Sequence, residues 1–283
     1  MSKSTTYKKK SNIAFVIFMN VIAWIVTIAA LYPVLWMTYS AVKDNNEFMV
    51  NTLSLPSKIM LSNFPKAFEV GQLWLAMGNS AFYAAVNVVI TVVFAIITAY
   101  FLARYDFKGK GLINFVYVMG MLIPLYALLV PIFVQYKMLD MLNNRLTLII
   151  TYYATNISLG IFLTESFIQG IPMDIDEASV IDGCSLSQRL TKIIFPLCKP
   201  IIATVSILTL LNTWNEFAFA VILTPDIKMR TVSVAIRYFT SGRHMDYTFL
   251  MAALLCTSLP VIIAYMLFSK EVIKGMTAGA VKG

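Results

Sequence analysis

Charged side chains are scarce in this sequence, and that scarcity excludes an ordinary soluble fold. Only 13% of the 283 residues are charged and 59% are hydrophobic, whereas an average soluble domain carries about 25% charged residues. A soluble chain so poor in charge could not cover its own surface with polar groups. The charges lie in short clusters between long apolar runs, so membrane topology explains the net charge of +8 better than a nucleic-acid partner does.

Residues that carry metal or acid–base chemistry are also rare. The single histidine, His244, has no nucleophile or base beside it, and the three cysteines, Cys184, Cys198 and Cys256, have no metal-ligand spacing. The sequence contains no GxxxxGK[ST] phosphate loop. We therefore expect no catalytic residues, no metal site, no disulfide framework and no cofactor bound by this chain. An intramembrane enzyme would need a nucleophile, a base or a metal-binding cluster at one membrane depth, and the sequence suggests none.

What the sequence has instead is long uncharged runs. A charge at the centre of a bilayer costs a few kcal/mol, and a helix needs about 20 apolar residues to cross. Five uncharged runs meet that length, and a sixth contains one acid, Glu216. The pattern predicts an all-α integral membrane protein with a single membrane domain over residues 1–283. Its six predicted spans are residues 13–39, 78–103, 112–136, 146–168, 201–224 and 247–268.

The basic residues predict the orientation of these spans. Six spans place both termini on one side of the membrane. The segments on that side hold more Lys and Arg than the segments on the opposite side. By the positive-inside rule, the N and C termini are expected in the cytoplasm. The chain itself is expected in the plasma membrane.

The predicted cytoplasmic segment 170–200 is too long for a plain turn. Pro172 and the acids after it indicate a helix start, and Gly183 is typical of a helix end. A second short helix fits residues 186–195, because Leu186, Leu190, Ile193 and Ile194 share one face. Two interpretations fit this apolar stripe: a helix lying among lipid headgroups, or a docking element for a cytoplasmic partner.

The same segment resembles the EAA motif of bacterial ABC-importer permeases. That pattern is E-A-A, three residues, G, nine residues, I, any residue, L, P. Here it is matched by Glu177-Ala178-Ser179, Gly183, and then Ile193, Phe195 and Pro196. Ser179 and Phe195 depart from it, in place of Ala and Leu. The match in spacing favours the docking interpretation.

The resemblance extends over most of the chain. Asn212-Thr213-Trp214-Asn215-Glu216-Phe217 looks like a segment in the fifth span of the carbohydrate-importing branch, and the ending Gly279-Ala280-Val281-Lys282-Gly283 is similar to that branch's C-terminus. The chain is thereby similar to the smaller permease type of the maltose-transporter class. The resemblance implies the ABC importer type I permease fold, with six transmembrane helices and a cytoplasmic two-helix coupling segment.

The resemblance also implies a function. Such a permease is not an enzyme; it forms half of a translocation pathway for sugars or oligosaccharides. Its implied partners are a second permease subunit, a dimeric cytoplasmic ATPase that binds ATP and magnesium, and an extracellular solute-binding protein. The implied ATPase-coupling residues are Glu177, Ala178, Ser179, Gly183 and Leu186.

The alternative functions are an importer for a polyol or glycerol phosphate, or a secondary transporter or channel. A secondary transporter or channel would need coupling or selectivity groups, and apart from Glu216 the apolar runs contain no Asp, Glu, Lys or Arg.

Polar residues inside the spans suggest where the pathway runs. Asn212, Asn215, Glu216 and Phe219 would share one face of the fifth span, which favours pathway lining or gating. On the second span, Tyr83 and Asn87 lie in a similar stripe with Ser80 and Thr91, where interhelical hydrogen bonding is the competing interpretation.

Two further features have open interpretations. Pro124 and Pro131 would each break or kink the third span. Such a kink either serves only the packing of the helices or forms a hinge between them. The predicted outer loop 226–246 is either solvated or, as the resemblance implies, a contact for the binding protein.

Overall fold

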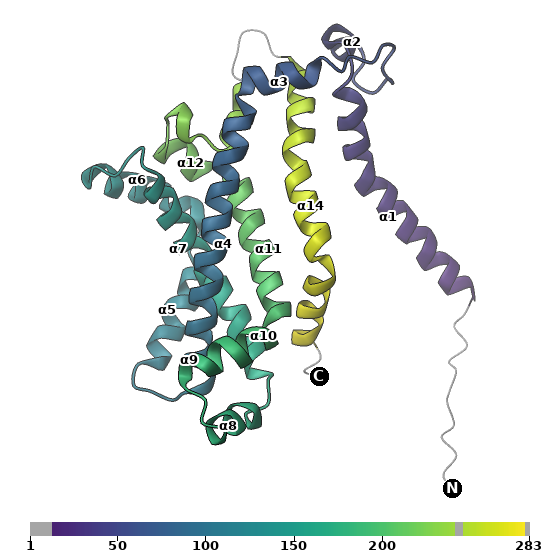
Figure 1. Ribbon diagram of the computed structural model, residues 1–283. Coiled ribbons are helices and arrows are strands. Elements are labelled where there is room, and N and C mark those ends of the chain that lie inside the picture. Colours follow the sequence, from purple (N-terminus) through teal and green to yellow (C-terminus); the bar gives the residue numbers. More distant parts are fainter. Residues whose placement is uncertain (1–12, 241–245, 281–283) are drawn as a thin grey trace.

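The computed structural model describes residues 13–240 and 246–280, and within those residues the chain is helical with no strand. The basic N-terminal cluster, His244 and the last three residues of the C-terminal motif lie outside the described residues. Figure 1 shows the arrangement of the helices.

Within residues 13–240 and 246–280, four helices are long and apolar enough to cross a membrane as continuous spans. They coincide with the first, second, fourth and sixth predicted spans to within a few residues at most ends, although the last helix continues further: α1 (Ile13–Ser40), α4 (Leu73–Arg104), α7 (Arg145–Gln169) and α14 (Tyr247–Ala280). Two bent pairs of helices raise the number of candidate spans to six if each pair is one span.

The third predicted span is broken. α5 (Lys110–Leu122) and the 3-10 turn η1 (Leu125–Leu128) with α6 (Leu129–Met138) meet at an angle of 95°. Ile123 is extended, with ψ 123°, because a residue before proline is sterically kept out of the helical region. The break therefore lies at Pro124. Pro131 breaks nothing, contrary to the sequence prediction, because it lies in the first turn of α6, where no amide hydrogen is needed.

The fifth predicted span, residues 201–224, is also interrupted, which the sequence analysis did not predict. α11 (Lys199–Asn215) ends at Glu216, whose ψ of 130° is extended, and α12 (Ala218–Leu223) follows. Asn212 and Phe219 therefore do not lie on one continuous helix.

The centre of the bundle is made by α4, α7 and α11, which pack against one another, and α14 packs along α11 (Figure 1). Gly160 of α7 allows the close approach, because a Cβ there would lie 3.2 Å from Thr91 of α4 and 3.4 Å from Val205 of α11. α1 diverges from this bundle, and its apolar side chains are exposed along most of its length.

Short helices cover the two ends of the bundle. At one end, α2 and α3 lie near the end of α1 and the start of α4; at the other end, four short elements form the segment between α7 and α11 (Figure 1). The short elements are α2 (Asn45–Val50), α3 (Asn63–Gly71), α8 (Asp174–Ile181), α9 (Leu186–Gln188), the π-helical η2 (Arg189–Ile194), α10 (Phe195–Leu197), the 3-10 turn η3 (Ile227–Met229) and α13 (Val232–Tyr238).

Candidate functional site

The segment between α7 and α11 folds as a helix, a glycine turn and a second helical stretch. α8 ends at Ile181, and Gly183 then takes a φ of +76°, a left-handed conformation that costs glycine little. Ser185 and Gln188 form a capping box, in which each side chain accepts a hydrogen bond from the other residue's backbone amide. The sequence prediction of a turn at Gly183 and a helix start at residue 186 is confirmed.

The second helical stretch is longer and less regular than predicted. α9, η2 and α10 run on to Leu197 and meet α11 at an angle of 77°. The predicted apolar stripe is unevenly buried, because Ile194 is fully buried while 37% of Leu186 is exposed. Pro196 and Pro200 each lie at the start of a new helix, α10 and α11, where proline is tolerated.

α8 presents an outward surface that nothing in the described chain covers. Glu177 and Ala178 are exposed on it, Val180 is 56% exposed and Ile181 is 85% exposed. Isoleucine and valine on a short helix at the end of the bundle are unfavourable in water, and grouped exposed apolar residues mark interaction sites. We call Glu177, Ala178, Val180 and Ile181 the docking face.

Ser179 does not belong to this face, although the sequence analysis grouped it with Glu177 and Ala178. It is 3% exposed, and its hydroxyl donates a hydrogen bond to the Asp176 carbonyl at 2.6 Å. Residues three apart on a helix lie on the same face, so Asp176 and Ser179 together face the bundle.

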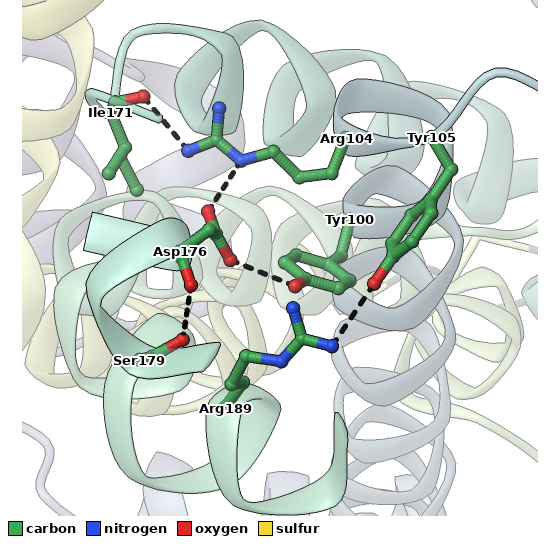
Figure 2. Close-up of polar contacts among 7 residues, drawn as sticks. All are labelled: Tyr100, Arg104, Tyr105, Ile171, Asp176, Ser179 and Arg189. Atoms are coloured by element: carbon green, nitrogen blue, oxygen red, sulfur yellow. Dashed lines mark hydrogen bonds and ion pairs between the residues drawn. The ribbon is translucent and has the colours of Figure 1, made fainter. Parts of the chain in front are cut away.

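Asp176 is fixed to the end of α4 by a buried ion pair. Its Oδ2 lies 2.8 Å from Nε of Arg104, and the side chains of the two residues are 5% and 6% exposed, respectively. The hydroxyl of Tyr100 donates to the other carboxylate oxygen at 2.8 Å. Figure 2 shows the carboxylate held between the guanidinium and the phenol. Asp176 is one of the acids after Pro172 that indicated a helix start, and their positions in the sequence did not predict this pair.

Two more contacts join the same end of α4 to the segments on either side of α8. A terminal nitrogen of Arg104 donates to the Ile171 carbonyl at 2.8 Å, just before α8. A terminal nitrogen of Arg189, after the glycine turn, donates to the Tyr105 hydroxyl at 3.3 Å. The residues before, within and after α8 are therefore all attached to residues 100–105 (Figure 2).

The predicted pathway residues of the fifth span separate into different environments. Asn212 and Asn215 are exposed near the end of α11. The Asn212 amide also donates to Asn156 of α7 at 3.1 Å. Phe219 is fully buried among Tyr83, Leu148 and their neighbours, so it is a core residue of this chain.

Glu216 lies at the break between α11 and α12 and serves as a cap. Its two carboxylate oxygens accept hydrogen bonds from the backbone amides of Phe219 at 2.7 Å and Ala220 at 3.0 Å. Those amides lie in the first turn of α12 and have no partner within the helix. The hydroxyl of Tyr152 donates to the same carboxylate at 2.9 Å. The carboxylate thus stabilises the interruption of the span.

The stripe of the second predicted span is buried inside the helix bundle. Tyr83 and Asn87 are fully buried, and the Asn87 amide donates to the Tyr83 carbonyl of its own helix at 3.1 Å. Ser80 is the member that bridges to another element, because it accepts a hydrogen bond from Val232 of α13 at 2.9 Å. Within the described residues, no group of His, Cys, Asp and Glu side chains could hold a metal ion.

Comparison with known proteins identifies the family of this chain. Residues 91–277 match the family model described as binding-protein-dependent transport system inner membrane component. The chain belongs to this family. The matched region starts within α4 and includes α8 and the docking face. The chain is thus a multi-pass inner membrane component of a transport system.

Several curated relatives span nearly the same length. The chain is 35% identical to the probable ABC transporter permease protein YurM of Bacillus subtilis (strain 168), in an alignment that covers 90% of this chain and 85% of that protein. It is 31% identical, over 92% of both chains, to the sulfoquinovosyl glycerol transport system permease protein SmoH of Agrobacterium fabrum (strain C58 / ATCC 33970). It is 32% identical to the trehalose/maltose transport system permease protein MalG of Thermococcus litoralis (strain ATCC 51850 / DSM 5473 / JCM 8560 / NS-C), in an alignment that covers 92% of this chain and 95% of that protein.

A solved structure shares the fold. A chain in the crystal structure of a bacterial ABC transporter involved in the import of the acidic polysaccharide alginate superimposes with a TM-score of 0.81. The alignment covers 94% of this chain and 99% of that chain, at 23% identity. The ABC importer permease fold predicted from the sequence is confirmed.

Proposed function

We propose that this chain is a non-catalytic permease subunit of an ATP-driven importer for sugars or oligosaccharides. The observation that carries the proposal is the docking face of α8, which is exposed, apolar and acidic, and is joined through Asp176 to a membrane bundle of the importer fold. A cytoplasmic ATPase dimer that binds ATP and magnesium docks there and drives the change in the pathway. The printed names of relatives such as SmoH and MalG support a sugar as the solute.

The remaining partners follow from the same family. A second permease subunit completes the pathway, and the exposed face of α1 together with Asn212 and Asn215 is available to it or to lipid. An extracellular solute-binding protein delivers the sugar to the end opposite α8. There, Val221, Pro225, Arg230, Val234, Arg237 and Tyr238 line a pocket of about 240 Å³.

Reconstitution tests this function. The chain is assembled with its second permease and ATPase in liposomes, and the binding protein is added outside with a panel of mono- and oligosaccharides. We expect one group of sugars to stimulate ATP hydrolysis and to accumulate inside. Uptake driven by an ion gradient without ATP would contradict the proposal and favour a secondary transporter. Stimulation by a polyol or glycerol phosphate alone would identify a non-sugar importer.

Substitutions of Gly183 test the turn that follows α8. A left-handed conformation costs a non-glycine residue about 1–2 kcal/mol, and asparagine tolerates it best. No atom lies within 4 Å of the position that a Cβ would occupy, so space is not limiting. We expect Gly183→Asn to transport nearly normally and Gly183→Val to lose most sugar uptake while remaining in the membrane. Equal uptake by the two variants would contradict this explanation.

The cysteines test the proposed orientation. Cys184 is partly exposed beside the glycine turn, whereas Cys198 is fully buried. With the α8 end in the cytoplasm, we expect a membrane-impermeant maleimide to label Cys184 in inside-out vesicles and not in intact cells. Cys198 is expected to react only after denaturation. Loss of the vesicle label in Cys184→Ser is the control, and labelling of Cys184 from outside would reverse the orientation.

A further inference from the structure

Asp176 provides the polar side-chain contacts between α8 and the bundle. Of its eight residues, Asp176 and Ser179 are buried, and Ser179 hydrogen-bonds only within α8. The polar side-chain contacts that cross from α8 to the bundle, among the described residues, are the ion pair with Arg104 and the hydrogen bond from Tyr100. Within α8 itself, the polar link to the bundle is therefore one carboxylate, which Figure 2 shows between Arg104 and Tyr100.

The helix that receives those contacts is continuous and reaches the opposite end of the molecule. α4 has 32 residues and contains no proline. Asn79, near its other end, donates to the carbonyls of Lys228 at 2.9 Å and Arg230 at 3.0 Å, and Ser80 accepts from Val232. At about 1.5 Å per residue, Arg104 and Asn79 are roughly 40 Å apart along the helix axis.

We propose that Asp176, Arg104 and Tyr100 form a joint that transmits the movement of the docked ATPase through α4 to the outer segment 228–232. This inference rests on the proposed function and names three positioning residues for it. None of the three is exposed enough to contact the ATPase. Their role is to make α8 and α4 move together, so that closure of the ATPase changes the outer end of the pathway.

The chemistry of the joint suits transmission better than stability alone. A buried ion pair contributes little net stability, because desolvation of the two charges offsets their attraction. It nevertheless fixes one geometry, since a charge displaced from its partner in a dry site is costly. The added bonds of Arg104 to Ile171 and of Arg189 to Tyr105 hold the flanking segments to the same end of α4. An apolar contact is non-directional, so it would let α8 shift its position against the end of α4.

The test measures sugar transported per ATP hydrolysed in the complete reconstituted complex. Asp176→Asn keeps the shape and can still accept from Tyr100, but it loses the charge that faces Arg104. Tyr100→Phe removes one hydrogen bond and keeps the ion pair. The matched controls are Asp174→Asn, an exposed acid in the first turn of the same helix, and Asp106→Asn, which removes the surface ion pair with Lys110.

We expect Asp176→Asn to co-purify with the ATPase and to hydrolyse ATP, while its ratio of transport to hydrolysis falls about five-fold or more, the lower range of typical coupling between sites. Tyr100→Phe should show a smaller fall, and both controls should keep the wild-type ratio. If Asp176→Asn fails to assemble, Tyr100→Phe decides by the same ratio.

A wild-type ratio in the assembled variants would overturn the joint and leave the proposed function intact. A fall in transport that only follows a loss of bound ATPase would also overturn it, because the residues would then serve docking alone. Failure of the wild-type chain to bind an ATPase would overturn the proposed function as well.

Discussion

Ile181→Glu should abolish stable association with the ATPase while leaving the chain folded in the membrane. Ile181 is 85% exposed at the end of α8, so the substitution disturbs no packing inside the chain. Burying an isoleucine side chain at an interface contributes about 2–3 kcal/mol, and a glutamate there would also have to lose its hydration. The dissociation constant should rise roughly 30- to 100-fold or more, measured by co-purification of the ATPase at several concentrations.

The control for this prediction is Val50→Glu. Val50 is 88% exposed on α2, at the end of the bundle opposite α8. The two substitutions have the same chemistry and nearly the same exposure, so a general effect of added charge on expression would appear in both. Undiminished ATPase binding by Ile181→Glu would show that the docking face is elsewhere.

Glu216→Ala should destabilise the protein and impair uptake by altering the interruption between α11 and α12. The substitution removes the acceptor for two amides of α12 and leaves the Tyr152 hydroxyl without its carboxylate partner. The lost cap and the unsatisfied hydroxyl together cost about 2–4 kcal/mol. We expect a lower unfolding temperature in detergent and reduced sugar uptake, with the ATPase still bound.

Glu216→Gln separates capping from charge. Glutamine keeps one acceptor oxygen for an amide of α12 and loses the negative charge. If the side chain acts as a cap, this variant should recover part of the stability and uptake that Glu216→Ala loses. Equal loss in both variants would indicate a gating charge, as the sequence first suggested. An unchanged unfolding temperature and uptake in Glu216→Ala would contradict both roles.

The local features of this fold could be predicted because each depends on nearby residues. Uncharged length predicts the continuous helices, and Pro124 predicts the break in the third span, since its ring restricts Ile123. Gly183 predicts the turn after α8, since glycine takes a positive φ cheaply. The family pattern likewise lies within about twenty residues of sequence.

Features that depend on contacts between distant segments were missed. Tyr100 and Asp176 are 76 residues apart, and no spacing indicates that the end of α4 meets the inner face of α8. The break at Glu216 has no proline or glycine beside it, so the apolar run hides it. Ser179 was predicted as a coupling residue because it occupies a position of the EAA motif, but it lies on the same face of α8 as Asp176 and is buried against the bundle.

The most direct test of the central claim is a cross-link from α8 to the ATPase. A photoreactive amino acid replaces Ile181 in the assembled complex, and the same probe replaces Trp74, which is 75% exposed near the start of α4 at the other end of the bundle. We predict an ATPase adduct from position 181 whose yield changes when ATP and magnesium close the ATPase, and none from position 74. An ATPase that binds the complex but never cross-links to position 181 would contradict the account.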